Sequence, residues 1–251
     1  TDKVKKRPQR VVFAEGDNYK ILKAAQIAKD EGLVEPILLG RRDRIHQLMD
    51  TYAIDMEGVT IIDPKDETIL STRLVYGKEL FKQRERKGLT EYESVKLMRE
   101  RNYFGAMMLQ VGDADAMVSG LTRNYKDVLM PGITILGKDD DSDIVAGMYL
   151  LLTKQGPLFF ADTTVNIDPS AEQLVKITTM VDKAVRSLNI VPNIAMVSYS
   201  NFGQSKGSDC TKMSDAVDIL HKNFPKICVD GEIQANFAFD NDLLKEKFPF
   251  S

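Results

Sequence analysis

The chain has 251 residues, of which 43% are hydrophobic and 28% charged, and its net charge at pH 7 is −3. That length can bury the core of one large domain or of two ordinary ones. No global basic charge and no apolar run of eighteen residues occur, so the sequence predicts neither a nucleic-acid nor a membrane partner. The chain begins with Thr1 rather than Met and has no signal peptide, which suggests a cytoplasmic chain cut from a longer one.

Strands and helices alternate in the first part of the chain. Residues 1–10 are rich in Lys and Arg and are expected to form a solvated linker. Three apolar runs predict buried strands, with amphipathic helical patterns between them: Val11–Ala14, Pro36–Leu39 and Val59–Ile62. This alternation is typical of βαβ units, and it predicts a largely parallel sheet covered by helices on both faces.

A long, charged helical stretch, Thr68–Arg101, comes next. Thr90 and Glu93 within it have the spacing of a capping box, which predicts that a new helix begins there. Ala116–Val118 is a further short apolar run, and it leads directly into Ser119. We interpret this run as another strand of the first sheet.

The second part of the chain starts after a polar, acidic tract, Lys138–Asp143. We expect this tract to join two domains, a first α/β lobe at residues 11–140 and a second at residues 141–251. Asp168 is expected to cap a helix that begins at Pro169. The other predicted elements of this lobe are a hairpin of Ile144–Thr153 and Leu158–Ala161, strands at Ile194–Val197 and Ile227–Val229, and helices at Lys212–Asn223 and Leu243–Lys247.

Cysteine and histidine are too scarce for metal chemistry. Cys210 and Cys228 are the only cysteines, and they form no CxxC pair. Two isolated thiols favour a reducing compartment over a disulfide framework. The two histidines, His46 and His221, lie in helical patterns far from both cysteines in the sequence. We therefore expect no metal site. We also expect no serine nucleophile, because we identify no GxSxG elbow and no suitably placed histidine.

Polar side chains gather directly after the predicted strands, where the ligand crevice of an open α/β sheet lies. They are Glu15, Asp63, Asp113, Asp115, Ser119, Asp162, Ser198, Ser200, Asp230 and Glu232. The pairs Asp113/Asp115 and Asp230/Glu232 could serve acid–base catalysis. Helix caps and turns account for more than half of these positions, and they are the better interpretation of both pairs.

The segment Ser198–Ser205 is the most informative of these strand ends. It carries hydroxyls and an amide, and Gly203 and Gly207 permit a close approach of a ligand to the backbone. Such a loop can offer N–H and O–H donors to a phosphate or a carboxylate. Its spacing is not that of a Walker A loop, and no GxGxxG fingerprint occurs in the chain.

Several motifs, taken together and in order, resemble a known family. The motifs are Arg10–Gly16, Asn102–Met108, Gly112–Ala116, Ser119–Gly120 and Val229–Glu232, which are similar to phosphate acetyltransferases. Ala161–Asn166 and Ser200–Gly203 are similar to the variant of this domain that follows the catalytic domains of NADP-dependent malic enzymes. The chain thus resembles the phosphate acetyl/butyryl transferase family along almost its whole length.

This resemblance implies two α/β lobes, of the phosphotransacetylase and isocitrate-dehydrogenase-like kind, with an acyl-CoA-binding cleft between them. The residues that it implies for binding acyl-CoA and phosphate are Arg84, Ser119, Gly120, Asp162, Asn166, Ser198, Ser200, Asn201 and Gly203. In transferases of the family, arginines hold the phosphate while the CoA thiolate attacks acetyl phosphate. Met130 stands where one such arginine precedes a proline, and the family's late Asn-Asp-Leu-Ser-Arg-Gly segment does not occur before Ser251.

These two differences lead us to expect no catalytic residue in this chain and no transferase activity of the chain alone. The expected function is an acetyl-CoA-responsive regulatory and oligomerisation domain of an NADP-dependent malic enzyme, which converts malate to pyruvate and CO₂. Its partners would be acyl-CoA, the upstream malic-enzyme domains and further copies of itself, with NADP and a divalent metal held only by the upstream domains. The alternatives are an active phosphate acetyl/butyryl transferase and a ligand-free assembly module.

Overall fold

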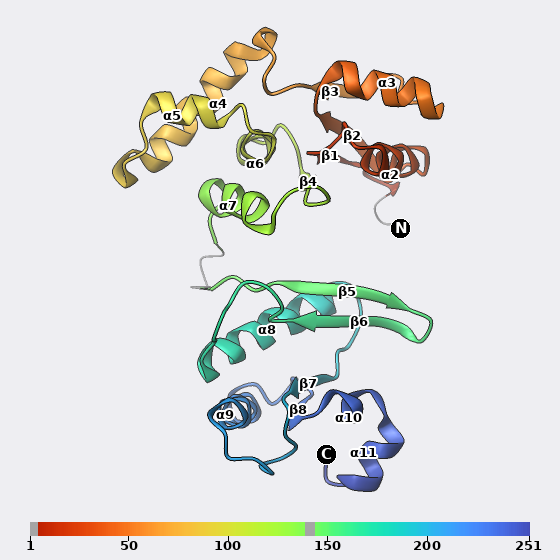
Figure 1. The fold of residues 1–251 in the computed structure, drawn as a ribbon, viewed down its shortest axis with the longest axis vertical. Coiled ribbons are helices and arrows are strands. Elements are labelled where there is room, and N and C mark those ends of the chain that lie inside the picture. Colours follow the sequence, from red (N-terminus) through yellow and green to blue (C-terminus); the bar gives the residue numbers. More distant parts are fainter. Residues whose placement is uncertain (1–4, 139–143) are drawn as a thin grey trace. The chain divides into compact units, whose positions relative to one another are not determined.

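A computed structural model describes residues 5–138 and 144–251 of the chain. The chain divides into two compact units, Thr1–Gly137 and Lys138–Ser251, and each is described by itself. Most of the predicted connecting tract, Lys138–Asp143, lies outside the described residues. Both units are built from strands and helices, so the α/β fold class that the sequence predicts is confirmed (Figure 1).

The first unit is a four-stranded parallel sheet with strand order β3-β2-β1-β4. Its strands are β1 (Gln9–Phe13), β2 (Val34–Leu39), β3 (Thr60–Ile62) and β4 (Ala116–Val118). Its helices are α2 (Tyr19–Asp30), α3 (Arg42–Tyr52), η1 (Glu67–Ile69), α4 (Leu70–Arg84), η2 (Glu85–Lys87), α5 (Glu91–Leu97), α6 (Arg101–Val111) and α7 (Tyr125–Ile135). β1 begins at Gln9, inside the predicted linker, because Gln9 and Arg10 pair in register with β2.

Alternating residues of the central strands bury both faces of this sheet. Val11 and Phe13 of β1 pack with the apolar side chains of α2 and α3. Val12, which points the other way, packs with those of α4 and α6, among them Phe104. Helices therefore cover both faces of the sheet, as the sequence predicts for βαβ units (Figure 1).

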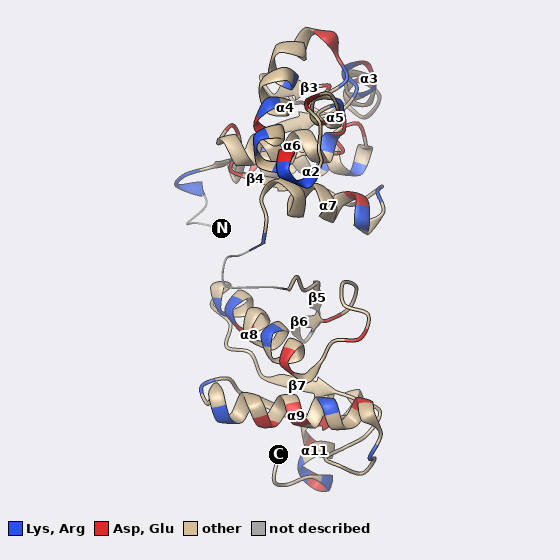
Figure 2. Ribbon diagram, turned by 90° about the vertical axis from the view of Figure 1, so that its left-hand side faces the viewer, with Lys and Arg blue, Asp and Glu red and all other residues tan. Residues whose placement is uncertain are grey.

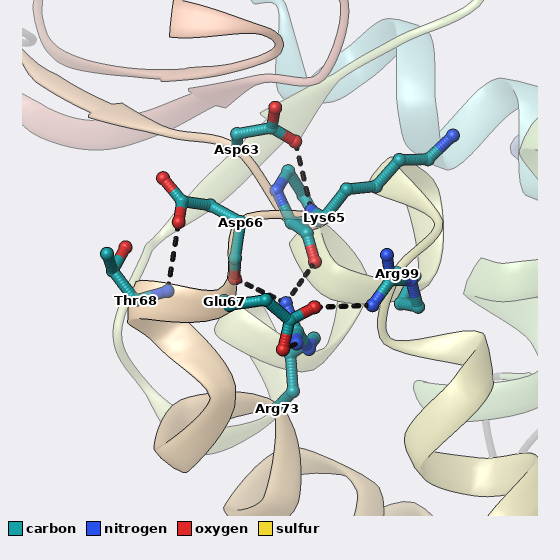
Figure 3. Close-up of polar contacts among 8 residues, drawn as sticks. Asp63, Lys65, Asp66, Glu67, Thr68, Arg73 and Arg99 are labelled. Atoms are coloured by element: carbon teal, nitrogen blue, oxygen red, sulfur yellow. Dashed lines mark hydrogen bonds and ion pairs between the residues drawn. The ribbon is translucent and has the colours of Figure 1, made fainter.

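A buried arginine fixes the corner where β3 leads into α4. Arg73 is 2% exposed, and its Nη1 donates to the carbonyl oxygens of Pro64, at 3.1 Å, and of Asp66. Its Nη2 donates to Glu67 Oε2 at 3.0 Å, and the other oxygen of Glu67 accepts from Arg99. Figure 3 shows this group of contacts. The corner thus depends on one guanidinium that replaces water for two backbone carbonyls.

The second unit contains two separate two-stranded sheets within the described residues. Its strands are β5 (Met148–Thr153), β6 (Gly156–Ala161), β7 (Ile194–Val197) and β8 (Val229–Ile233), and its helices are α8 (Ala171–Ser187), α9 (Ser208–Asn223), α10 (Ala235–Phe239) and α11 (Asn241–Lys247). β7 and β8 are parallel and share a core with α8 and α9. β5 and β6 form the predicted antiparallel hairpin.

The hairpin leaves much apolar surface uncovered. Every residue of β5 is exposed, and Leu152 is exposed by 84%. Neither strand carries a charged residue, as the uniform tan colour of β5 and β6 shows (Figure 2). No helix in the described parts of the chain is long and apolar enough to cross a membrane.

Candidate functional site

The strand order places a crevice at the carboxyl ends of β1 and β4. From β1 the chain proceeds to β2 and β3 on one side, and β4 returns to pair with β1 on the other. This reversal is a topological switch point, where α/β sheets bind their ligands. Glu15 follows β1 and Ser119 follows β4, so both lie at this crevice.

Glu15 organises the loop that follows β4. It is 3% exposed, and its Oε2 accepts hydrogen bonds from the backbone N–H groups of Gly120 at 3.0 Å and Leu121 at 2.8 Å. Its Oε1 accepts from the N–H of Thr122 at 2.7 Å and from the Thr122 hydroxyl. Burial alone would raise the pKa of Glu15, but these hydrogen bonds outweigh it and lower the pKa. An ionised carboxylate therefore holds residues 120–122.

Helix α7 separates two of the residues that the resemblance implies for binding. The Ser119 hydroxyl donates to Asn102, whose side-chain amide donates to the Asp127 carbonyl in the first turn of α7. The Arg84 guanidinium donates instead to the carbonyls of Ile133 and Thr134, in the last turn. At 1.5 Å per residue these two ends of α7 are about 10 Å apart. Arg84 thus satisfies carbonyls that end the helix without intrahelical partners.

A cavity of about 480 Å³ lies beside the loop that Glu15 holds. Its lining residues come from the start of α2, one face of α3 and the loop after β4: Asp17, Asn18, Tyr19, Lys20, Arg44, Leu48, Tyr52, Leu121 and Thr122. The rings of Tyr19 and Tyr52 are 4.2 Å apart, and both are about half exposed. The cavity therefore combines flat aromatic surface with cationic side chains.

The uncompensated charge of this cavity is positive. The Asp17 carboxylate is neutralised by Arg101, whose Nη1 and Nη2 donate to its two oxygens at 2.6 and 2.5 Å. Burial alone would raise the pKa of Asp17, but the hydrogen bonds and the charge of Arg101 outweigh this effect, so the pKa is lowered. Within the described residues, no carboxylate pairs with Lys20 or Arg44, and Arg44 donates only to the neutral Gln47. Such a site favours an anion next to a planar group.

The sequence did not predict four of the residues that line this cavity: Tyr19, Lys20, Arg44 and Tyr52. One signal for them was available: Arg44 and Tyr52 are eight residues apart, with Leu48 between them, and this spacing places all three along one helix face. Tyr19 and Lys20 begin the helix directly after the strand end at Glu15. The contact between this face of α3 and the start of α2 is a tertiary contact, and residue spacing does not predict it.

In the second unit a buried glutamate has a comparable position. Glu232 of β8 is 1% exposed, and its Oε1 accepts from the Gly203 N–H at 2.7 Å and from the Ser200 hydroxyl at 3.3 Å. The Ser200 hydroxyl in turn accepts from the N–H of Ser205 at 3.0 Å. Phe202 and Gly203 have left-handed φ angles of 45° and 81°, so the loop after β7 turns sharply between them. These contacts hold the loop of residues 198–205.

The remaining predicted residues of this loop have partners of their own. Asn201 and Gln234 exchange hydrogen bonds, and the Ser198 hydroxyl lies 3.3 Å from the buried Cys210 thiol. The expectation that no GxSxG elbow occurs is wrong, because residues 203–207 (Gly-Gln-Ser-Lys-Gly) match that pattern. The Ser205 hydroxyl faces Tyr199, whereas the imidazole of His221 bonds to a backbone carbonyl. The structure thus shows no serine–histidine pair at this loop.

Asp162 and Asn166 lie in the loop after β6. Asp162 has a left-handed φ of 55°, and one of its carboxylate oxygens is buried with no hydrogen-bond partner in the described chain. Burial raises its pKa, and Asn166 and Lys212 offset part of that effect. Lys212, in the first turns of α9, also donates to Asp168 at 2.5 Å. Lys212 thereby connects this loop to the helix that follows the loop of Ser198 to Ser205.

The structure therefore places eight of the nine predicted binding residues in two sets, one in each unit, and Arg84 belongs to neither because it binds the last turn of α7. Ser119 and Gly120 lie at the crevice of the first unit, and the six residues of the second unit lie in the loops after β6 and β7. The shared cleft between the units stays a prediction. Among residues 5–138 and 144–251, no three acidic, cysteine or histidine side chains are placed to hold a metal ion.

Comparisons with known proteins bear on this arrangement. The family described as "phosphate acetyl/butaryl transferase" matches residues 1–251. The phosphate acetyltransferase of Clostridium acetobutylicum is 34% identical over 254 residues, which cover 98% of this chain and 75% of that protein. The NADP-dependent malic enzyme of Escherichia coli is 31% identical over 248 residues, which cover 98% of this chain and 33% of that protein. A solved phosphotransacetylase from Streptococcus pyogenes has a TM-score of 0.83 at 30% identity, with 100% of this chain and 75% of that one covered.

The chain covers very different fractions of the lengths of its relatives. It covers 35% of the phosphate acetyltransferase of Nitratidesulfovibrio vulgaris, in contrast to 75% of the Clostridium protein. The resemblance that the sequence motifs indicate is confirmed for the family and for the fold, but relatives of both names match the chain at comparable identity. Since the family match extends over every residue, this chain belongs to the phosphate acetyl/butaryl transferase family.

Proposed function

We propose that this chain carries the acyl-CoA-binding part of a phosphate acyltransferase, which moves an acyl group between CoA and phosphate. The observation that carries the proposal is the cavity beside residues 120–122. CoA contains an adenine ring and several phosphate groups. Tyr19 and Tyr52 offer aromatic surface on which a base can stack, and Lys20 and Arg44 offer charge to phosphate oxygens. The cavity also lies at the switch point of the sheet, where such ligands bind.

In the proposed reaction the CoA thiolate forms a bond to the acyl carbon of an acyl phosphate. The bond from that carbon to the bridging oxygen breaks, and phosphate leaves with the electron pair. For this, the chain would have to hold the nucleotide end of CoA, for which the cavity of the first unit offers its aromatic and cationic side chains. Cationic side chains near the phosphate stabilise the negative charge with which it leaves.

Reversal of the two cationic charges tests the binding step. In the full-length protein that contains this chain, we expect Lys20→Glu with Arg44→Glu to weaken CoA binding about tenfold or more for each lost charge. Isothermal titration calorimetry with CoA gives the affinity directly. The matched control is Lys78→Glu with Arg86→Glu, which makes the same change in net charge at two exposed positions of the first unit. Equal affinity of the cavity variant and the wild type would refute the assignment of this cavity.

A second function has one specific observation in its favour. Met130, on α7 and 42% exposed, replaces an arginine of the transferase pattern, and this supports an acetyl-CoA-responsive regulatory and oligomerisation domain of an NADP-dependent malic enzyme. A guanidinium binds phosphate oxygens with two parallel donors, whereas a thioether has no such donor. The relatives named phosphate acetyltransferase nevertheless support acyl transfer better, so we place that function first.

One pair of assays separates the two functions. Formation of acetyl-CoA from acetyl phosphate and CoA by the full-length protein would support acyl transfer. Binding of acetyl-CoA without turnover, together with a change in malate-dependent NADPH formation, would support the regulatory domain. Absence of any CoA binding would favour an assembly module, and it would contradict both.

A further inference from the structure

We propose that Glu15 and Glu232 are positioning residues, each of which sets the shape of the ligand loop on the neighbouring parallel strand. The inference rests on the proposed function in one respect, namely that these loops face a ligand. Glu15 follows β1 and holds the loop after the adjacent β4. Glu232 lies in β8 and holds the loop after the adjacent β7. The same device therefore occurs once in each unit.

Both carboxylates act on the backbone rather than on solvent. Glu15 and Glu232 are 3% and 1% exposed, so neither can touch a ligand without a rearrangement of its loop. Their acceptor atoms bind N–H groups of residues 120–122 and 203, which an isolated turn would leave to water. A loop whose backbone is fixed in this way is preorganised for a ligand, because no ordering is needed when the ligand arrives.

The two glutamates differ in how many of their carboxylate oxygens accept hydrogen bonds. Both oxygens of Glu15 accept two hydrogen bonds each, from Gly120 and Leu121 at Oε2 and from Thr122 at Oε1. Only Oε1 of Glu232 has partners, and its Oε2 is buried with none in the described chain. This asymmetry leads to different consequences for one and the same substitution, glutamate to glutamine.

Glutamine retains one carbonyl oxygen and replaces the other oxygen with an NH₂ group. At position 15, either orientation of the amide directs an NH₂ group at backbone N–H donors, and donor then faces donor. At position 232, the carbonyl can keep the Oε1 contacts with Ser200 and Gly203 while the NH₂ group takes the place of the unpartnered Oε2. Glu15→Gln should thus release its loop, and Glu232→Gln should not.

Hydrogen exchange measured by mass spectrometry on the full-length protein tests this without any ligand. We expect amides in peptides covering residues 117–124 to exchange about tenfold faster or more in Glu15→Gln than in the wild type. Peptides covering residues 199–207 should stay within about twofold in Glu232→Gln but accelerate like the first loop in Glu232→Ala. Glu57→Gln, an exposed glutamate of the first unit, is the matched control. Unchanged exchange in Glu15→Gln, or equal acceleration in Glu232→Gln and Glu232→Ala, would overturn the inference.

Two further measurements keep the result decisive. Should Glu15→Gln fail to fold, Glu15→Asp retains the charge but withdraws it by one carbon, and it must also accelerate exchange at residues 120–122. Where the wild type binds CoA, Glu15→Gln should weaken that binding about tenfold while Glu232→Gln changes it less than about threefold. Unchanged CoA affinity of a folded Glu15→Gln protein would remove the positioning role. If the wild type binds no CoA, the proposed function falls, and the exchange data alone decide this inference.

Discussion

Replacement of Phe104 by alanine is expected to lower the free energy of unfolding of the first unit by about 3–5 kcal/mol. Phe104 is 1% exposed, lies on α6 against the sheet, and has its ring 5.1 Å from that of Tyr76. Deletion of the ring removes its burial energy and leaves a cavity that helices on a rigid sheet cannot close. Because the loss is a large share of the stability of an ordinary domain, part of the protein should be unfolded without denaturant.

The measurement is urea unfolding monitored by circular dichroism, with the wild-type chain as reference. Tyr92→Ala is the matched control, since Tyr92 is also an aromatic residue of the first unit but is 76% exposed. That variant should change the free energy of unfolding by about 0.5 kcal/mol or less. Similar losses in the two variants would mean that the α6 face of the sheet is not the main core of this unit.

Arg73→Ala is the second substitution with a large expected effect, a loss of about 2–4 kcal/mol in the free energy of unfolding. The truncation leaves the carbonyls of Pro64 and Asp66 buried without the guanidinium that now binds them. It also leaves a cavity, because Arg73 is among the largest fully buried side chains of the chain. Thermal and urea unfolding curves give the change.

The neighbouring Arg99 supplies the control for this prediction. Arg99 binds the same carboxylate, Glu67, but its side chain is 44% exposed, so water can replace the lost contact. We expect Arg99→Ala to lose only a small fraction of what Arg73→Ala loses. Comparable losses would show that the ion pairs of Glu67, rather than the two carbonyls, stabilise the corner between β3 and α4.

Local patterns predicted the elements whose ends are determined by neighbours in the sequence. The capping box of Thr90 and Glu93 is present with both of its hydrogen bonds, and the predicted hairpin forms. The prediction that Asp168 caps α8 is wrong, because Ser170 forms a capping box with Gln173. Both Asp168 and Ser170 are good caps, but Ser170 has Gln173 three residues later, and the Asp168 carboxylate pairs instead with Lys212, forty-four residues away.

Contacts between distant segments account for what the sequence could not give. Polar residues after the strands led to the prediction of a ligand crevice at the carboxyl ends of β1 and β4, but they did not show that the loop after β4 saturates Glu15 with hydrogen bonds. Asp115, a candidate for acid–base catalysis, instead binds Arg10, which lowers its pKa to about 2. Asp113 accepts a hydrogen bond from the Tyr76 hydroxyl. Such pairings join residues more than thirty positions apart, so the hydrophobic periodicity of the sequence cannot predict them.

The hairpin of β5 and β6 has a consequence for handling this chain. Among the described residues β5 pairs only with β6, so its other edge presents unpaired backbone groups next to the exposed Leu150, Leu151 and Leu152. One lysine is the only charged residue between Met148 and Ala161. Long apolar edges of this sort pair with identical edges on other molecules. We therefore expect aggregation of this chain to increase with its concentration. Dilute storage, or a charged substitution at Leu152, should extend the time for which it stays in solution.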